Sequence, residues 1–354
     1  MEKIVEGLAT NLVAKGHQCD VVTLNRSFGD GGAFKPYDSK DGVNIYRIGF
    51  RGSKRYPVAP DVSRFVGRYD IVHVHGTDFL LDWLVFTRRW HKRPVVLSTH
   101  GGFFHTDYAK WVKKIWFQTL TRRTLRGVDR ILASSEHDLQ LFQRISDNCE
   151  LARNAVDLSV YKALKNRPKP GTFVCVGRVD VHKGIANLLG ALAALKRVHD
   201  APFKLHIVGP CVAAGLLDSL ALEVERLGLS QNVVFEGRVE FERLHSLVAE
   251  AELALFPSEY EAFGISVVEA MGAGVLSILN DIEPFRHFVA NEDSGLLVDF
   301  SDSQAAALKI KTALSLPPKL RKTMCSRARS KALEYDWEAS VSVFEETYRQ
   351  VLGD

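Results

Sequence analysis

The sequence predicts an α/β fold with two domains, each built on a parallel β-sheet covered by helices. Three observations carry this prediction. Short apolar runs alternate with longer segments of helical periodicity, which is the pattern of parallel sheets. The alternation occurs twice, on either side of the basic, proline-bearing stretch Lys165–Gly171. The length of 354 residues is enough for two domains with separate cores.

The first series of strands is expected in residues 1–165. The chain opens on a helical pattern that ends near Gly16, and apolar runs follow it. We expect these runs to form the sheet of an N-terminal domain. They are Asp20–Leu24, Asn44–Ile48, Ile71–His75, Val95–Ser98, Arg130–Ala133 and Glu150–Ala152.

The second series is expected in residues 166–335, after a linker at Lys165–Gly171. The amphipathic segment Trp337–Leu352 is expected to form a final helix within residues 336–354. The strands of the second domain begin at Thr172 and continue at Lys204–Val208, Asn232–Phe235, Leu253–Phe256, Val275–Leu279 and Gly295–Val298.

The composition excludes several classes of protein. Hydrophobic residues make up 46% and charged residues 25%, as in soluble globular proteins. The chain has no run of about eighteen apolar residues, and it does not open on a signal peptide. The five cysteines are scattered and contain no C-x-x-C pair, which favours reduced thiols over a disulfide or zinc framework. A cytoplasmic location is therefore expected.

The segment Phe256–Gly274 carries the strongest functional signal. A short apolar strand precedes a helix that is expected to begin just after Gly264. The free N–H groups of such a helix end bind anions such as phosphate. Glu261 in the loop and Glu269 on the helix can accept hydrogen bonds from sugar hydroxyls. The segment predicts a nucleotide-sugar site; a solvated helix face with an incidental loop glutamate is the alternative.

A second strand–turn–helix unit follows the strand that begins at Thr172. This strand ends at Gly177, and Arg178 and Lys183 lie at the mouth of the turn. Two cations at this place suit a diphosphate, because arginine makes bidentate contacts and lysine is a point charge. The dinucleotide pattern G-x-G-x-x-G and the Walker A pattern are both absent. Ordinary surface cations are the alternative.

Together these motifs resemble the retaining nucleotide-sugar glycosyltransferases of family 4, which have the GT-B fold of two Rossmann-like domains facing a cleft. The resemblance covers nearly the whole chain. The family's G-R-x-x-x-x-K-G pattern matches Gly177–Gly184, and its E-x7-E pattern matches Glu261 and Glu269. Val208–Pro210 stands where a V-G-x-G turn is usual, and Asn154–Asp157 matches N-G-V-D with alanine in place of glycine.

The resemblance implies that the second domain binds the nucleotide sugar. Arg178 and Lys183 would neutralise the diphosphate, Glu261 would bind the hexose and Glu269 the ribose. The nucleotide would then leave without a metal or another cofactor. The expected catalytic residues are His100, Arg178, Lys183 and Glu261. The expected donor-binding residues are Gly177, Arg178, Lys183, Gly209, Glu261, Phe263, Gly264 and Glu269.

The first domain is expected to bind the acceptor. The strand Asp70–His75 and the turn Ser98–Gly102 look like the family's acceptor-domain signatures. The stretch Thr99–His105 is most similar to bacterial exopolysaccharide α-mannosyltransferases that use GDP-mannose. His100 is expected to contact the sugar near the reacting carbon, unless it is a satisfied strand-end histidine. The further acceptor-side candidates are His105, Ser134 and Ser135, although serines at strand ends are also common turn formers.

The resemblance therefore implies a hexosyltransferase that acts with retention in polysaccharide biosynthesis. Its best donor is GDP-mannose, and its acceptor is a glycan or a lipid-linked saccharide. Two alternatives remain open. One is a sugar-nucleotide-binding protein without turnover, and the other is a sugar-nucleotide epimerase with the GT-B fold.

The segment Lys110–Arg126 indicates a membrane contact. It holds six basic residues and no acidic one, interleaved with Trp111, Trp116 and Phe117. A basic, aromatic helix suits an anionic membrane surface and would make the protein peripheral to the membrane. An ordinary core helix is the alternative. Nucleic-acid binding is the weaker one, since no recognised module accompanies the segment.

The start of the chain departs from the family pattern. The family opens with a strand and a Gly-Gly-x-Glu loop, whereas this chain begins inside the following helix, with Met1–Glu2 at the end of that loop. We expect Met1 to be an internal methionine in the gene. Without the first strand, the sheet of the first domain is expected to have exposed edges.

Overall fold

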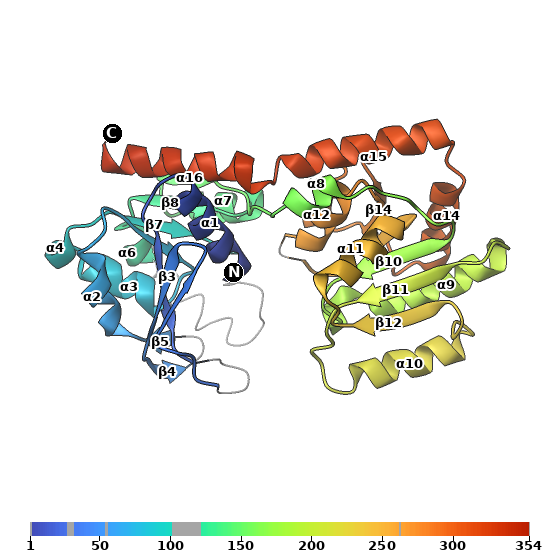
Figure 1. The fold of residues 1–354 in the computed structure, drawn as a ribbon, viewed down its shortest axis with the longest axis horizontal. Coiled ribbons are helices and arrows are strands. Elements are labelled where there is room, and N and C mark those ends of the chain that lie inside the picture. Colours follow the sequence, from blue (N-terminus) through green and yellow to red (C-terminus); the bar gives the residue numbers. More distant parts are fainter. Residues whose placement is uncertain (1, 27–31, 54–55, 101–121, 262, 354) are drawn as a thin grey trace. The chain divides into compact units, whose positions relative to one another are not determined.

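The protein is described by a computed structural model that covers residues 2–26, 32–53, 56–100, 122–261 and 263–353. The chain divides into two compact units. Unit 1 comprises Met1–Ala155 and Trp337–Asp354, and unit 2 comprises Val156–Asp336 (Figure 1). Each unit contains parallel strands covered by helices, so the predicted fold class is confirmed.

The boundary between the units lies earlier than the sequence indicates. The stretch Lys165–Gly171, expected as a linker, belongs to unit 2. The reason is that its backbone is hydrogen-bonded there: the N–H groups of Arg167 and Lys169 donate to the carbonyls of Ala249 and Glu250. The change of unit falls instead between Ala155 and Val156.

The sheet of unit 2 consists of parallel strands in the order β12-β11-β10-β13-β14-β15. Each of these strands lies within or overlaps an apolar run of the sequence. The strands are β10 (Thr172–Val176), β11 (Lys204–Val208), β12 (Val233–Gly237), β13 (Leu253–Phe256), β14 (Leu276–Asn280) and β15 (Leu296–Val298).

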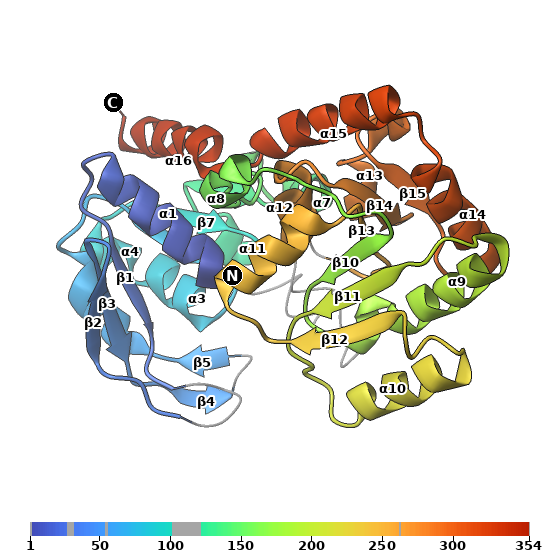
Figure 2. The same cartoon turned by 45° about the vertical axis from the view of Figure 1, so that its right-hand side comes forward.

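The central strands β10, β13 and β14 are buried on both faces, which explains why their sequences are largely apolar. In β10, Phe173 and Cys175 belong to one core and Val174 to the other. Figure 2 shows helices on the two sides of the sheet. One core takes α9 (Ile185–Val198), α10 (Leu216–Arg226) and α14 (Ser303–Leu314). The other takes α8 (Ser159–Ala163), α11 (Phe241–Glu250), α12 (Ile265–Gly272), α13 (Glu283–Arg286) and α15 (Pro318–Leu333).

The described strands of unit 1 form separate sheets, ordered β1-β3-β2 and β6-β7-β8-β9, with a β4-β5 hairpin. Among the described strands, β1 and β6 are edge strands of their sheets. The strands are β1 (Asp20–Leu24), β2 (Tyr37–Lys40), β3 (Val43–Ile48), β4 (Arg51–Ser53), β5 (Tyr56–Val58), β6 (Val72–His75), β7 (Val95–Ser98), β8 (Arg130–Ala133) and β9 (Cys149–Leu151).

The core of unit 1 lies between β6, β7, β8 and the short helices that follow them. Val95, Leu97 and Ile131 are fully buried at its centre. The helices are α1 (Glu2–Ala14), α2 (Ser63–Val66), α3 (Phe79–Phe86), α4 (Arg88–His91), α6 (Arg122–Leu125) and α7 (Glu136–Gln143). None of the helices in the described ranges is long and apolar enough to cross a membrane.

The last helix, α16 (Trp337–Leu352), belongs to unit 1 and packs on α1. Gly7 makes this contact possible, because a Cβ at its position would lie 2.4 Å from Trp337 Cε2. Further along the helix, the carboxylate of Glu345 accepts hydrogen bonds from Lys15 and from His17, whose Nε2 is 2.9 Å away. The two ends of the chain are thus held together in one unit.

Candidate donor site and acceptor-side residues

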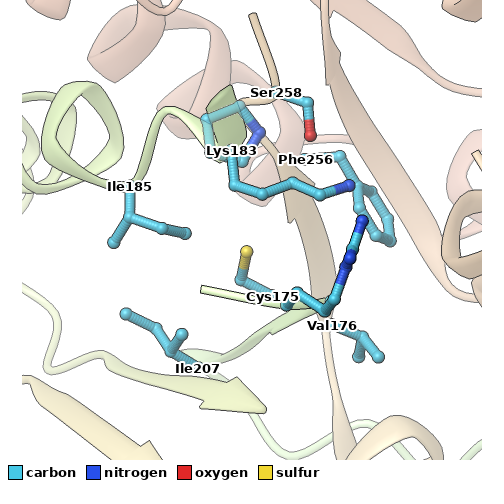
Figure 3. Close-up of a pocket in the computed structure, with 10 residues that line it drawn as sticks. Cys175, Val176, Lys183, Ile185, Ile207, Phe256 and Ser258 are labelled. Atoms are coloured by element: carbon cyan, nitrogen blue, oxygen red, sulfur yellow. The ribbon is translucent and has the colours of Figure 1, made fainter. Parts of the chain in front are cut away.

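The candidate donor site lies beyond the carboxyl ends of β10 and β13 in unit 2, where ligands bind in open parallel sheets. A small pocket opens there (Figure 3). Its lining is largely apolar and includes the two cations that the sequence singles out. The lining residues are Cys175, Val176, Gly177, Arg178, Lys183, Ile185, Ile207, Phe256, Pro257 and Ser258.

Lys183 and Glu261 form an ion pair at this pocket. Lys183 ends a short 3-10 helix, Val181–Lys183, and Figure 3 shows its side chain extending across the pocket towards Phe256. The side chains of the pair are 21% and 22% exposed, so their charges are partly withdrawn from water. The structure thus brings together the residue expected to hold the diphosphate and the residue expected to hold the hexose.

The N-terminus of α12 lies beside this ion pair. No side chain caps the helix, although the N–H groups of Val267 and Val268 donate to the Gly264 carbonyl. Such a helix end can bind an anion through the N–H groups that precede them. A Cβ placed on Gly177 would be 3.9 Å from Ser266 Oγ and 4.0 Å from Lys183 Nζ. Gly177, Lys183 and Ser266 therefore surround one space. The sequence analysis missed Ser266, although its position as the second residue of the helix was a usable signal.

Two glycines fix the backbone around this space. Gly264, which precedes α12, has a φ of +104°, a conformation that residues with a Cβ rarely adopt. Gly209 follows β11, and a Cβ there would lie 1.9 Å from the carbonyl oxygen of Gly177. The turns after β10 and β11 are thus in direct backbone contact, which explains why glycine occupies the second position of Val208–Pro210.

Arg178 and Phe263 occupy different environments from each other. The Arg178 side chain is exposed, and in the described part of the chain it has no acidic partner, so it is available to a ligand. The Phe263 ring packs on Phe288 and Tyr335, with ring centroids 5.7 and 5.5 Å apart. Its side chain is partly buried and packs against the core of unit 2. Both assignments stay predictions.

Glu269 is held by Tyr161, a residue that the sequence analysis did not identify. The hydroxyl of Tyr161 donates a hydrogen bond to the carboxylate. Burial and the neighbouring Glu269 raise the pKa of Tyr161 well above its usual range, so the tyrosine remains a donor. No sequence signal links α8 to α12, because the two helices come together only in the folded unit.

In unit 1, His100 lies at the end of a row of partly buried histidines. Its Nε2 is 3.0 Å from His75 Nδ1, and the two rings are stacked. His73 continues the row, with its ring centroid 4.3 Å from that of His75. His73 Nε2 is hydrogen-bonded to Ser98 Oγ at 2.8 Å, and His73 Nδ1 is hydrogen-bonded to Tyr348 Oη at 2.6 Å. Burial lowers the pKa of His100 to about 4 and that of His73 to about 3, so both are neutral at pH 7.

Ser134 and Ser135 take part in the start of α7. The Asp138 carboxylate accepts hydrogen bonds from Thr99 Oγ1 at 2.6 Å and from Ser134 Oγ at 3.2 Å. Ser135 Oγ accepts the backbone N–H of Asp138 at 3.1 Å and so caps the helix. Both serines therefore have structural partners, and their contact with an acceptor stays a prediction.

The remaining candidates fall largely outside the described residues. His105 lies there, and so does the part of Lys110–Arg126 that precedes Arg122; Arg122–Leu125 forms α6. In the described ranges, no cluster of three or more His, Cys, Asp or Glu side chains could hold a metal ion.

Each half of the chain matches a known protein family. Residues 1–160 match the family described as "Glycosyltransferase Family 4". Residues 161–331 match the family described as "Glycosyl transferases group 1". The two matches together account for almost all of units 1 and 2.

Similar proteins extend over nearly the full length. The chain is 37% identical to a GDP-mannose:cellobiosyl-diphosphopolyprenol alpha-mannosyltransferase from Xanthomonas oryzae, over 96% of this chain and 92% of that protein. It is 31% identical to a protein of the same name from Komagataeibacter xylinus, over 96% of this chain and 86% of that protein. Among solved structures, a sucrose-phosphate synthase from Thermosynechococcus elongatus has a similar fold, with a TM-score of 0.74 and 22% identity over 99% of this chain and 92% of that chain.

Proposed function

Since the chain belongs to glycosyltransferase family 4 and is a glycosyltransferase of the GT-B fold, we propose that it transfers mannose from GDP-mannose to a lipid-linked saccharide. The donor and the acceptor are those named for the similar proteins of Xanthomonas and Komagataeibacter. The observation that carries the proposal is the Lys183–Glu261 ion pair beside the uncapped N-terminus of α12.

This arrangement offers a complementary group to each part of a nucleotide sugar. The first-turn N–H groups of α12, with Lys183 and Arg178, receive the diphosphate. Glu261 accepts hydrogen bonds from the hexose hydroxyls, and Glu269, oriented by Tyr161, accepts those of the ribose. Ser266 adds a hydroxyl next to the diphosphate space.

The proposed reaction is a substitution at the anomeric carbon of mannose. The bond from this carbon to the diphosphate oxygen breaks, and GDP leaves with the electron pair. The oxygen of an acceptor hydroxyl bonds to the same carbon from the same face, and its proton passes to the departing phosphate oxygen. Arg178 and Lys183 stabilise the negative charge that grows on the diphosphate. The configuration at the carbon is retained, and the proposed route includes no metal or other cofactor.

We place this reaction at the cytoplasmic face of a membrane, with the enzyme as a peripheral protein. A lipid-linked acceptor is confined to a bilayer, whereas GDP-mannose is a soluble cytoplasmic metabolite. The basic and aromatic segment Lys110–Arg126 supports this placement through its composition.

The test is a transfer assay with a detergent-dispersed cellobiosyl-diphosphate lipid as acceptor. GDP-mannose, UDP-glucose, UDP-galactose and UDP-N-acetylglucosamine are supplied separately, and mass spectrometry follows the acceptor. We expect one added hexose with GDP-mannose only. Lys183→Ala should lower the rate about 100-fold, as the loss of one transition-state donor does. Arg197→Ala, which removes an exposed cation far from the site on α9, should leave the rate unchanged.

Other outcomes would contradict the proposal. Donor binding without any product, across all four donors, would favour a binding protein. Interconversion of the sugar on the nucleotide, in the absence of acceptor, would favour an epimerase. Wild-type turnover by Lys183→Ala at saturating donor would remove Lys183 from the site.

A further inference from the structure

A row of aromatic side chains leads from α3 to an exposed end at α4. Phe79 and Trp83 are stacked 5.7 Å apart, Trp83 and Phe86 are 6.3 Å apart, and Phe86 and Trp90 are 6.0 Å apart. The row begins partly covered, where Trp83 Nε1 donates to Ser63 Oγ at 2.8 Å. It ends in water, because Phe86 is 64% and Trp90 62% exposed. The two adjacent exposed rings form an apolar patch on the surface of unit 1.

Cations surround the exposed end of the row. The stretch Arg88–Arg93 holds four basic residues and no acidic one. Two of them have structural partners: Arg88 binds Asp129 and the carbonyl of Gly127, and Arg93 donates to the carbonyl of Gly67. These bonds hold the short helix α4 in place (Figure 1).

The other two cations are directed to solvent. Arg89 and Lys92 are exposed, and within the described ranges neither has an acidic partner. The guanidinium of Arg89 lies over the Trp90 ring, 4.8 Å from its centroid. The surface formed by Phe86, Arg89, Trp90 and Lys92, here termed the α4 tip, therefore combines two exposed aromatic rings with two unpaired positive charges.

We propose that the α4 tip docks on an anionic lipid bilayer. Its composition fits the membrane interface, where aromatic rings sit at the depth of the headgroups and basic side chains meet the lipid phosphates. A protein partner is the competing occupant, since Trp, Phe and Arg are also enriched at protein interfaces, and the experiment below distinguishes the two. The inference deepens the proposed function, since a lipid-linked acceptor requires the enzyme to reach a bilayer.

The α4 tip also changes where the membrane contact is expected. The sequence analysis assigned this contact to Lys110–Arg126, and most of that segment lies outside the described residues. The α4 tip is a separate surface, carried by described residues. Arg88, at the start of α4, donates a hydrogen bond to the carbonyl of Gly127. The exposed residue Arg126 precedes Gly127, so the end of the Lys110–Arg126 segment lies near α4.

The experiment measures co-sedimentation of the full chain with vesicles of phosphatidylcholine and phosphatidylglycerol in a 3:1 ratio (about 25% anionic lipid), and with pure phosphatidylcholine. One double variant, Arg89→Gln with Lys92→Gln, removes the free charges. A second, Phe86→Ser with Trp90→Ser, removes the rings. Arg88 and Arg93 are kept because they anchor the helix. The matched controls are Arg197→Gln with Lys204→Gln, and Phe241→Ser, which alter exposed residues of unit 2.

We expect the wild type and the controls to bind anionic vesicles more tightly than neutral ones. Each double variant of the α4 tip should weaken binding to anionic vesicles about tenfold or more. Quenching of tryptophan fluorescence by brominated lipid should fall in the Phe86→Ser, Trp90→Ser variant. Binding unchanged in both double variants, or equal binding of the wild type to both kinds of vesicle, would overturn the proposal. A shift from dimer to monomer on ring removal, without loss of vesicle binding, would identify a protein interface instead.

The transfer assay with detergent-dispersed acceptor separates this proposal from the proposed function. The α4 tip variants should keep wild-type rates there, because no bilayer is present. If vesicle binding depends on the α4 tip but the protein transfers no mannose, the proposed function is contradicted and the docking surface is supported. If the protein transfers mannose but does not bind vesicles, the docking surface is contradicted and the proposed function is supported.

Discussion

Lys183 and Glu261 compensate each other's charge before a donor binds. A diphosphate that takes over Lys183 leaves the Glu261 carboxylate without its partner in a partly buried place, which is costly. Sugar hydroxyls can then supply the missing hydrogen bonds. In the proposed donor site, we therefore expect the ion pair to couple the two halves of the ligand and to favour a nucleotide sugar over a free nucleoside diphosphate.

This coupling makes Glu261→Gln informative. The variant should weaken GDP-mannose binding and strengthen GDP binding, because Lys183 is released while a sugar acceptor is lost. The ratio of the two dissociation constants should fall about tenfold or more, the size of a hydrogen bond to a charged group. Titration calorimetry measures both constants. Glu225→Gln, at an exposed position of α10, is the control, and an unchanged ratio in Glu261→Gln would exclude the coupling.

The role of Tyr161 is tested by removing a single oxygen. Tyr161→Phe should raise the KM for the donor roughly tenfold with little change in kcat, because a ribose contact contributes equally to ground state and transition state. In a Glu269→Gln background the same change should have almost no further effect, since the partner is already altered. Additive effects of the two substitutions would show that Tyr161 acts only through packing.

His100 and His73 predict that the stability of unit 1 depends on pH. Above pH 6.5 both side chains are neutral in the folded and in the unfolded protein, so their ionisation does not change the free energy of unfolding there. Below pH 6.5 the histidines become protonated in the unfolded chain. In the folded chain His100 binds a proton only near pH 4 and His73 only near pH 3, because their pKa values are lowered. The free energy of unfolding of unit 1 should therefore fall by about 1.4 kcal/mol per pH unit for each histidine. His73→Gln should reduce this slope between pH 6 and 4.5 in urea titrations, and His199→Gln, in unit 2, serves as the control. An equal slope in both variants would contradict the assignment.

At the scale of elements, the sequence predicts the buried strands well and the exposed ones poorly. Strand β10 is apolar on both faces, so its pattern identifies it directly. Strands β2 and β4 are exposed along their whole length and carry no apolar alternation, so nothing in the sequence marks them. They are strands because β2 pairs with β3 and β4 with β5, and this pairing cannot be inferred from their own residues.

The donor site shows the same division. Lys183, Glu261 and the start of α12 could be predicted because each belongs to a local strand–turn–helix pattern. Tyr161 could not, because its bond to Glu269 depends on how α8 and α12 pack. Ser266 lies between these cases: its place in the helix was visible, and its approach to Gly177 was not.

The start of α12 depends on Gly264. A Cβ there would require an unfavourable φ and would lie 2.9 Å from the Phe285 ring. Gly264→Ala should destabilise unit 2 by about 1–3 kcal/mol and raise the KM for the donor, because the anion-binding turn must move. Gly228→Ala is the matched control, since Gly228 has a similar φ sign, at +67°, and open space around it. Equal donor KM values in the two variants would separate the helix start from donor binding.

At the scale of the whole molecule, α16 stabilises the unit at the other end of the sequence. Gly7→Val should force α16 away from α1, because even a Cβ at this position would lie 2.4 Å from the Trp337 ring. Thermal unfolding of unit 1 should shift to lower temperature by several degrees, as expected for a loss of 1–3 kcal/mol from overpacking (about 4 °C or more). Nucleotide binding by unit 2 should be unchanged. Gly67→Ala, which has no neighbour within 4 Å of the added atom, should leave both properties as they are.

The return of α16 to unit 1 also sets an order of events during synthesis. Unit 2 is continuous in sequence, so all of its strands have left the ribosome once Asp336 has emerged. Unit 1 lacks the helix that covers α1 until α16 has emerged, because α16 follows unit 2 in sequence, whereas α1 precedes it. Domains fold as units while translation proceeds at about 5–20 residues per second. The nascent chain should therefore complete the donor-binding half first, and its N-terminal half should depend longest on protection from aggregation.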